Sequence, residues 1–168
     1  MKDDQYFLSL ATDEGNNNPK PYNFGAVIVK DVKVIAQDHN HVHEKHDPSA
    51  HAEVSALRQA ALAQNNHNID GCIMYGNHEP CLMCFCCAAW ANVARVVYAV
   101  PASELNSDSY EFIGVNLKDL AKKLVNPIQV DLVPLLKWTW FNSDADAHTI
   151  NLLTRFLELA LDINQSYH

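Results

Sequence analysis

The chain has 168 residues, 48% of them hydrophobic and 19% charged, which is enough for one domain with a hydrophobic core and argues against a disordered protein. Its formal net charge of −8 makes a nucleic-acid partner less expected, because such proteins usually carry a basic face. The polar start and the lack of a long apolar run predict no export signal or membrane span, so we expect a cytoplasmic protein whose five cysteines stay reduced or bind metal.

The first part of the chain predicts a helix followed by a β-hairpin. Residues 5–12 have an apolar side and are expected to form a short helix, and residues 14–21, rich in asparagine and proline, an irregular loop. Two β-rich runs follow at 24–30 and 32–37. The connection between them is so short that a hairpin is expected.

Residues 38–46 form a polar segment with four of the nine histidines. His39, His41 and His43 would share one face if the strand continued, because strand side chains alternate. With His46 nearby, a second metal site is one interpretation. A solvated strand end or loop is the other and is favoured, because no cysteine or helical spacing completes a coordination set.

Helices and strands are then expected to alternate. Asp47 suits the N-cap and Pro48 the first position of a helix that should end within residues 65–68. The next elements expected are a strand, a helix that starts at Pro80, and a second strand, over 72–75, 81–90 and 95–100. This order predicts an α/β protein.

The C-terminal part is expected to add a loop over 107–113, a helix over 117–124 and a strand over 128–133. A long last helix is expected over roughly 144–163. Neither a repeat nor a linker interrupts the sequence. We therefore expect a single domain over residues 1–168, with a core at about 5–133 and a C-terminal extension at about 134–168.

Two short motifs contain the candidate chemistry, His-Ala-Glu at 51–53 and Pro-Cys-Leu-Met-Cys at 80–84. His51, Cys81 and Cys84 supply three ligands, which leaves a fourth position open as in a catalytic zinc site. The two cysteines are three residues apart at a helix start, where the helix dipole lowers thiol pKa. If both helices leave the same end of the sheet, their N-termini converge on one point.

Glu53 is the candidate proton carrier. Zinc would lower the pKa of a bound water, and Glu53 would take its proton and later deliver it to the substrate and the leaving ammonia. Burial beside a substrate could raise the carboxyl pKa as this task requires. In a straight helix, however, residues two apart point away from each other, so spacing alone does not bring Glu53 to the ion.

A structural zinc site with a fourth protein ligand is the alternative. Cys86 or Cys87 could supply that ligand, but helical spacing turns Cys86 away from Cys84, and a small buried side chain is the better interpretation. Cys72 is interpreted in the same way. Two further apolar side chains of this region are expected in the core, Met83 and Trp90.

The stretches Asp-Pro-Ser-Ala-His-Ala-Glu at 47–53 and Glu-Pro-Cys-Leu-Met-Cys at 79–84 lie in a segment, about 24–98, that resembles the cytidine-deaminase-like superfamily, in its branch of guanine deaminases and tRNA adenosine deaminases. The resemblance implies a three-layer α/β/α fold with a mixed five-stranded sheet, here with an extra C-terminal helix. It also implies one zinc ion per chain, usually in a homodimer.

The resemblance also implies roles for single residues. His51, Cys81 and Cys84 would be the zinc ligands, and Glu53, placed beside the ion, the proton shuttle. The side chain of Asn40 and the backbone N–H of Ala52 would contact the substrate base. Two positions depart from the family pattern and could line the pocket, Phe24 and His78.

Three functions are open at this point. The first is a zinc-dependent hydrolytic deaminase of a free nucleobase or small nucleoside, with guanine the first substrate to try. The alternative is a tRNA-specific adenosine deaminase that converts adenosine to inosine. The third is a non-catalytic, zinc-stabilised binding module, which the glutamate beside an open ligand position argues against.

Overall fold

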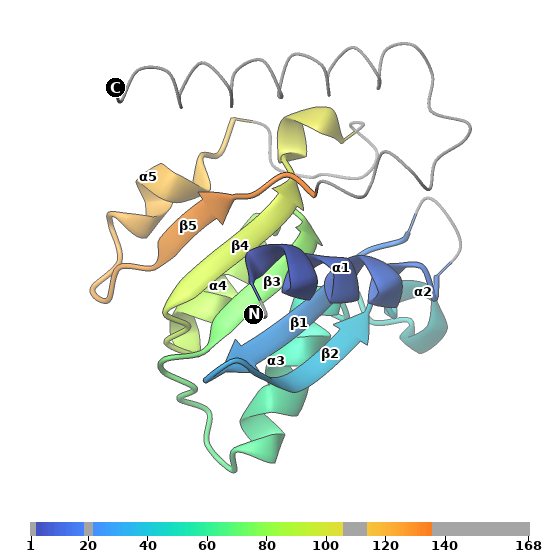
Figure 1. The fold of residues 1–168 in the computed structure, drawn as a ribbon, viewed down its shortest axis with the longest axis horizontal. Helices are drawn as coiled ribbons and strands as arrows, with labels where there is room; N and C mark the ends of the chain where they lie inside the picture. Colours follow the sequence, from blue (N-terminus) through green and yellow to red (C-terminus); the bar gives the residue numbers. More distant parts are fainter. Residues whose placement is uncertain (1–2, 19–21, 106–113, 136–168) are drawn as a thin grey trace. The chain divides into compact units, whose positions relative to one another are not determined.

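A computed structural model describes residues 3–18, 22–105 and 114–135. They form a five-stranded mixed sheet with strand order β2-β1-β3-β4-β5, flanked by helices (Figure 1). The strands are β1 (Gly25–Lys30), β2 (Lys33–His39), β3 (Ile73–His78), β4 (Arg95–Val100) and β5 (Gln129–Leu132). Strand β1 is antiparallel to both neighbours, whereas β3, β4 and β5 are parallel. Four strands therefore run in one direction and β1 against them.

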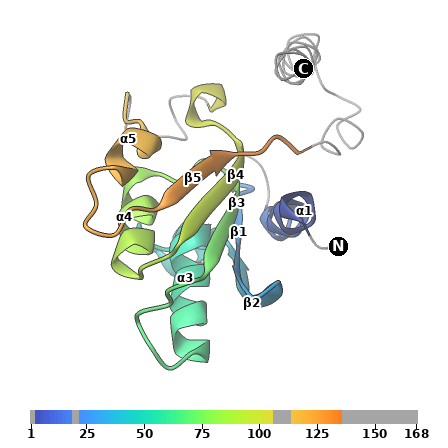
Figure 2. The same cartoon turned by 60° about the vertical axis from the view of Figure 1, so that its left-hand side comes forward.

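The helices lie on both faces of the sheet, as the turned view in Figure 2 shows. Helix α1 (Asp4–Gly15) covers one face, and α3 (Ala52–Ala63), α4 (Leu82–Trp90) and α5 (Leu117–Ala121) lie on the other. A short α2 (Val42–Lys45) and a 3-10 turn at Ala102–Glu104 complete the described elements. The predicted α/β fold with a mixed five-stranded sheet is confirmed.

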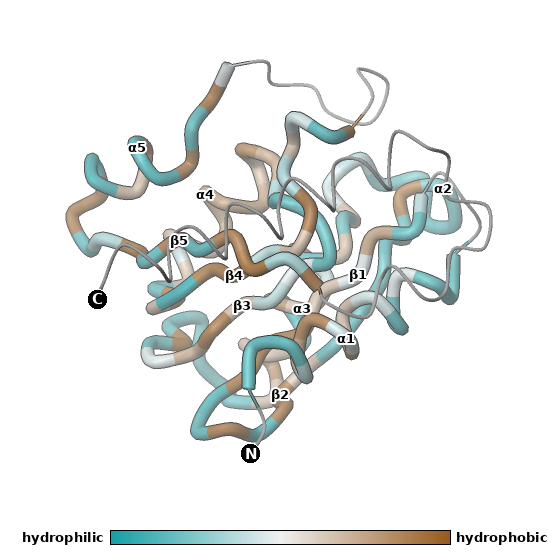
Figure 3. The backbone as a smooth tube through the Cα atoms, turned by 45° about the horizontal axis from the view of Figure 1, so that its top comes forward, coloured by the Kyte–Doolittle hydropathy of each residue, from teal (hydrophilic) through white to brown (hydrophobic). Residues whose placement is uncertain are grey.

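Alternation along the central strands builds two cores. In β3 and β4, Met74 and Val96 pack with α3, α4 and α5, while Tyr75 and Val97 pack under α1. Both faces of these strands are buried, and β4 is hydrophobic at every position after Arg95 (Figure 3). Helix α1 approaches so closely that a Cβ on Gly25 would collide with the backbone oxygen of Ala11.

Several predicted boundaries were close. The strand at 95–100 has the predicted bounds, the first helix and the hairpin are present, and the strand predicted at 128–133 is β5. The strand predicted at 72–75 continues to His78, and the helix predicted at 117–124 ends at Ala121. The loop at 107–113 and the helix at 144–163 lie outside the described residues. The division into a core and a C-terminal extension stays a prediction.

The predicted start of α3 was wrong. Asp47 and Pro48 precede the helix, which begins at Ala52 with His51 as its N-cap residue. The carboxylate of Asp47 accepts hydrogen bonds from the backbone N–H and the hydroxyl of Ser49 at 2.8 and 2.7 Å. This Asp residue therefore closes a turn two residues long, which competes with its use as a helix cap.

Two side chains predicted in the interior are exposed. Trp90 is 85% exposed at the end of α4, and Cys86 lies one turn before it on the same face. Met83 is half-buried, and Cys72 is buried as expected. Nearly all residues of α4 are apolar, so its two faces do not differ in hydrophobicity and the exposed face could not be predicted. Within the described ranges, no helix has the length and hydrophobicity needed to cross a bilayer.

Candidate metal and catalytic site

Strands β2 and β3 run in the same direction, and the chain passes from β2 through α2 into α3 and from β3 into α4, so the two helix N-termini lie at the same edge of the sheet. His51 and Cys81 are the N-cap residues, both with extended backbone, at ψ 155° and 166°. Neither side chain makes a capping hydrogen bond in the described structure. Both are therefore available to a ligand at the positive ends of the two helices.

Three candidate ligand atoms form a nearly regular triangle. Cys81 Sγ lies 3.6 Å from His51 Nδ1 and 3.5 Å from Cys84 Sγ, and Cys84 Sγ lies 3.5 Å from His51 Nδ1. A tetrahedral zinc ion with ordinary Zn–S and Zn–N bond lengths needs ligand separations of about 3.5–3.8 Å. The three side chains therefore fit zinc, and a fourth position remains open.

The protonation of this cluster also favours a cation. The hydrogen bond from Cys84 lowers the pKa of Cys81 to about 4, and the pKa of Cys84 rises well above its usual value because it holds the shared proton. The contact with Cys81 raises the pKa of His51. A metal ion at the centre of the triangle would displace this proton and bind both sulfurs as thiolates.

Glu53 lies at the same cluster, with Oε2 3.4 Å from Cys84 Sγ and only 8% of the residue exposed. Spacing alone did not predict this, because helical residues two apart diverge. His51, however, precedes the helix in extended backbone, so the helical rotation does not relate it to Glu53. Burial, followed by repulsion from Cys81, raises the pKa of Glu53, as suits a group that both accepts and donates a proton.

Phe24 and His78 form one wall at this edge of the sheet. The antiparallel register pairs Ala26 with Gly76, so its continuation places Phe24 opposite His78, and their ring centroids are 4.9 Å apart. Strand alternation puts both on the face of the sheet that carries α3 and α4. His78 is also only three residues before Cys81, which brings this wall to the metal-ligand cluster.

His78 holds a buried polar atom with no hydrogen-bond partner in the described structure, its Nδ1. Burial lowers the pKa of His78 to about 4, so the imidazole is neutral at pH 7. An unpaired buried polar atom costs about 1–3 kcal/mol, so this nitrogen is a candidate contact for a bound ligand.

Asn40 and Ala52, the two residues predicted to contact a substrate base, lie at the end of β2 and at the start of α3. Asn40 follows β2, and its backbone N–H donates to Phe24 O at 3.1 Å, which ties it to the same wall. Its side-chain oxygen accepts from Val42 N at 3.3 Å, leaving the amide nitrogen as the group that could meet a base. Ala52 is fully buried and is the first residue of α3, where backbone N–H groups lack partners within the helix.

Sequence reasoning missed the residues that support this wall. Asn77 is buried; its Oδ1 accepts from Gly25 N at 3.0 Å and its Nδ2 donates to Asn23 O at 2.7 Å, which fixes the backbone on both sides of Phe24. Glu79 accepts a hydrogen bond from Ala102 N at 2.8 Å and so anchors the turn before Pro80. The only sequence feature that could have indicated Asn77 is its polar side chain within a predominantly apolar segment.

The histidine-rich segment divides into two parts. The strand ends at His39, and α2 begins at Val42, so the shared face predicted for three histidines does not extend to His43. His43 and His46 are exposed, and His43 packs beside Tyr22 with ring centroids 4.2 Å apart. His39 and His41 come together with Asp38 as a second group of potential metal ligands.

Comparison with known proteins agrees with this geometry. Residues 1–100 match the cytidine and deoxycytidylate deaminase zinc-binding region. Guanine deaminase of Bacillus subtilis is 37% identical over 116 residues, 69% of this chain and 71% of that protein. A tRNA-specific adenosine deaminase of Aquifex aeolicus is 34% identical over 97 residues, 56% of this chain and 64% of that protein.

Solved structures give the same result. The X-ray structure of the Bacillus subtilis guanine deaminase has a TM-score of 0.60 and 29% identity, covering 86% of this chain and 99% of that one. A structure from a study of tRNA:A34 deaminases has a TM-score of 0.64 and 25% identity, covering 76% of this chain and 91% of that one. The chain belongs to the cytidine and deoxycytidylate deaminase zinc-binding family, whose members are hydrolytic deaminases.

Proposed function

We propose that this protein is a zinc-dependent deaminase that acts on a free nucleobase or small nucleoside, with guanine as the first candidate. The observation that carries the choice of a small substrate is the charge around the site. The chain has a formal net charge of −8, and Arg58 on α3 is already paired, because it lies 3.7 Å from Asp47 and donates to Ser49. A tRNA anticodon loop would require cations free to contact phosphates.

In this proposal His51, Cys81 and Cys84 hold the zinc ion. Zinc bound there lowers the pKa of water and so supplies a nucleophile at neutral pH. Their positions support the assignment, because the ligand triangle has the dimensions of a tetrahedral site and its fourth corner is open. The ordered start of each helix presets these distances before the ion binds.

Glu53 acts as the proton shuttle. It takes the proton that the attacking water loses and delivers it to the ring nitrogen next to the reacting carbon. It then takes the proton of the newly attached hydroxyl group and passes it to the exocyclic amine, which leaves as ammonia while the C–O bond becomes a carbonyl. Burial of Glu53, which keeps the cost of adding and removing its proton small, supports this role.

Asn40, Ala52, Phe24 and His78 contact the substrate. The ring of Phe24 offers an apolar face for the base, and the Asn40 amide and the Ala52 N–H offer donors. His78 Nδ1 meets a polar edge group of the base and gains the hydrogen bond for which the described residues offer no partner. We retain the homodimer as a prediction, which sedimentation of the purified protein would test.

A substrate panel tests the proposal. Purified protein loaded with zinc is incubated with guanine, adenine, cytosine and their nucleosides, and ammonia release is followed. We expect turnover of a free base, guanine first, that is lost in Glu53→Gln. Turnover confined to tRNA, seen as inosine formation that weakens as salt rises, would instead assign the chain to tRNA deamination.

A further inference from the structure

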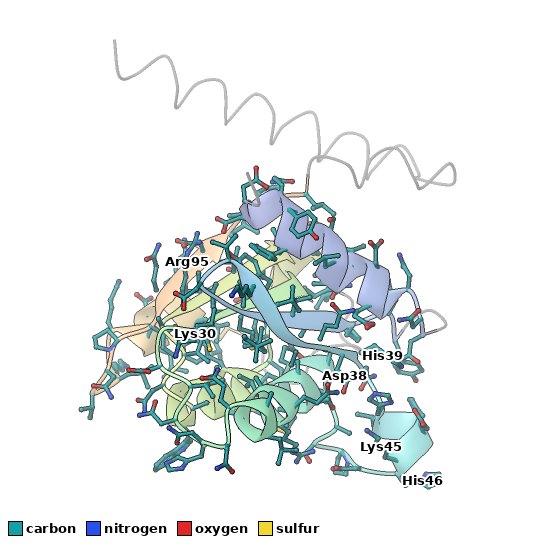
Figure 4. All side chains as sticks on the ribbon, turned by 60° about the horizontal axis from the view of Figure 1, so that its bottom comes forward. Lys30, Asp38, His39, Lys45, His46 and Arg95 are labelled. Carbon is teal, nitrogen blue, oxygen red and sulfur yellow. The ribbon has the colours of Figure 1, made fainter. Side chains whose placement is uncertain are left out.

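A second cluster of metal-ligating side chains lies at the end of β2, apart from the three candidate ligands of the deaminase site. Asp38 and His39 end the strand, and His41 precedes α2; Figure 4 shows Asp38 and His39 together beside this helix. Potential ligand atoms of these three residues all lie within 4.8 Å of one another. We propose that Asp38, His39 and His41 form a second site for a divalent transition-metal ion.

The contact between His41 and Asp38 motivates the proposal. His41 Nδ1 is 2.6 Å from Glu44 Oε2, and His41 Nε2 is 2.8 Å from Asp38 Oδ1. A neutral imidazole has one N–H, so it can donate to only one of two carboxylates. The second nitrogen then points its lone pair at a carboxylate oxygen, a repulsive contact that is relieved either by a metal ion between the two atoms or by a second proton on the ring. The separation of 2.8 Å is ordinary for adjacent ligands around one metal ion.

The ligand types suit a transition metal. Two imidazoles and one carboxylate make the set that binds iron, cobalt, nickel or zinc with positions left for water. Asp38 Oδ1 also lies 3.9 Å from His39 Nδ1, and the rings of His39 and His41 lie side by side, with centroids 4.3 Å apart and planes tilted by 39°. These contacts direct the two rings toward the same carboxylate.

Outer hydrogen bonds hold the ligands as known metal sites do. The Glu44 carboxylate accepts a hydrogen bond from Nδ1 of His41, the ring nitrogen that faces away from Asp38. A carboxylate in this position fixes the tautomer and the orientation of a metal-binding histidine. Gln59, from α3, donates to the second oxygen of Asp38 at 2.7 Å. Asp38 is only 8% exposed, so its charge needs a partner, and a dication would balance the two carboxylates around His41.

A proton is the competing occupant. Burial lowers the pKa of His41, but its hydrogen bonds to Glu44 and Asp38 outweigh burial and raise it. A protonated His41 would donate a hydrogen bond to each carboxylate, and its ring would then have no free nitrogen to bind a metal ion. Counting bound metal at neutral pH separates these two states.

The site has a structural consequence for the deaminase pocket. Asn40 lies between His39 and His41, its carbonyl accepts from Asn18, and its N–H donates to Phe24 O. An ion bound by both flanking histidines would fix the backbone that presents Asn40. The second metal is therefore placed to order the substrate wall without touching the reacting atoms.

Metal counting tests the proposal directly. The full chain is dialysed against a modest excess of Zn²⁺ at neutral pH, and zinc per chain is measured by mass spectrometry. We expect two ions in the wild type and one in each of His41→Ala and Cys81→Ser. The control His43→Ala, an exposed histidine on the same segment, should keep two.

Cobalt substitution identifies which ion is lost. Cobalt bound by thiolates gives strong charge-transfer absorption, so His41→Ala should keep that absorption and lose one equivalent of metal. Asp38→Asn should behave in the same way and guards against misfolding of a single variant. An equal zinc content in the wild type, His41→Ala and Asp38→Asn would overturn the proposal whatever the fate of the deaminase assignment.

Discussion

The two faces of the sheet treat their polar groups differently. On the α1 face, both oxygens of the Asp4 carboxylate accept hydrogen bonds from Arg95 at 2.9 Å, and Asp4 also accepts one from the Tyr75 hydroxyl at 2.8 Å. Arg95 donates a further hydrogen bond to Asp131 at 2.6 Å. On the α3 and α4 face, the thiols crowd one imidazole, Glu53 is buried beside a sulfur, and His78 Nδ1 lacks a described partner. Among the described residues, the charged groups of the first face pair with one another, whereas the second face presents groups suited to a metal and a substrate.

Removing a metal ligand should show this contrast most strongly. Cys81→Ser takes one corner from the zinc triangle, so we expect deaminase activity to fall more than about 100-fold, beyond the losses seen for groups that merely orient ligands. The measurements are ammonia release and zinc content.

Cys86→Ser is the matched control on the same helix. Because Cys86 is exposed, Cys86→Ser should have the zinc content and the deaminase activity of the wild type. Equal losses in Cys81→Ser and Cys86→Ser would mean that the helix as a whole, rather than the triangle, supports activity.

His78→Leu tests whether the wall awaits a ligand. Leucine removes the unpaired Nδ1, so the free protein should gain about 1 kcal/mol of unfolding free energy. At the same time KM should rise by about 10-fold to 100-fold, because the base loses a hydrogen-bond partner. Thermal unfolding without substrate and steady-state kinetics measure the two effects. A variant that is destabilised and has an unchanged KM would show that His78 is only structural.

Asp4→Asn should affect stability rather than chemistry. The hydrogen bonds from Arg95 hold the pKa of Asp4 below its usual 3.8, so this carboxylate stabilises the fold above about pH 4 and the contribution is lost as pH falls further. We expect the variant to lose about 1–2 kcal/mol at pH 7 and to show a smaller decline in acid. Urea unfolding at several pH values measures this.

Asp13→Asn, an exposed carboxylate on the same helix, is the comparison for Asp4→Asn and should leave stability nearly unchanged. A loss of the same size in both variants would contradict the role given to the Arg95 pair.

The smallest effect is expected in the hairpin. The turn between β1 and β2 holds Asp31 and Val32 at φ 50° and 63°, a conformation that a β-branched residue rarely adopts. Val32→Gly should relieve about 1 kcal/mol of strain, partly offset by the flexibility of glycine in the unfolded chain. A raised melting temperature with unchanged activity is the expected result, and a lowered one would show that the Val32 side chain stabilises the turn.

Local sequence patterns predicted part of the fold and of the site. The ligand spacing of Cys81 and Cys84 and the β-rich run at 95–100 are local patterns, and both predicted their structures well. The helix start at Ala52 was missed because Asp47 uses its carboxylate within a turn. The exposure of Trp90 was missed because both faces of α4 are apolar.

Contacts between residues far apart in the sequence could not be predicted from local sequence patterns. The Asp4–Arg95 pair joins residues 91 positions apart, and Asn77 supports Phe24 across 52 to 54 positions. The approach of Glu53 to Cys84 depended on His51 lying before the helix, which follows from the true helix start. Substrate choice stays a prediction for the same reason, because the wall is assembled from β1, β2 and β3.

The most direct test of the central claim is the zinc content and turnover of Glu53→Gln measured on one preparation. The amide keeps the size of the side chain but cannot shuttle a proton, so the protein should keep its catalytic zinc and lose about 10²-fold to 10⁴-fold in turnover of its preferred base. Retained zinc with wild-type turnover would contradict the account, because the buried carboxylate would then have no part in the chemistry.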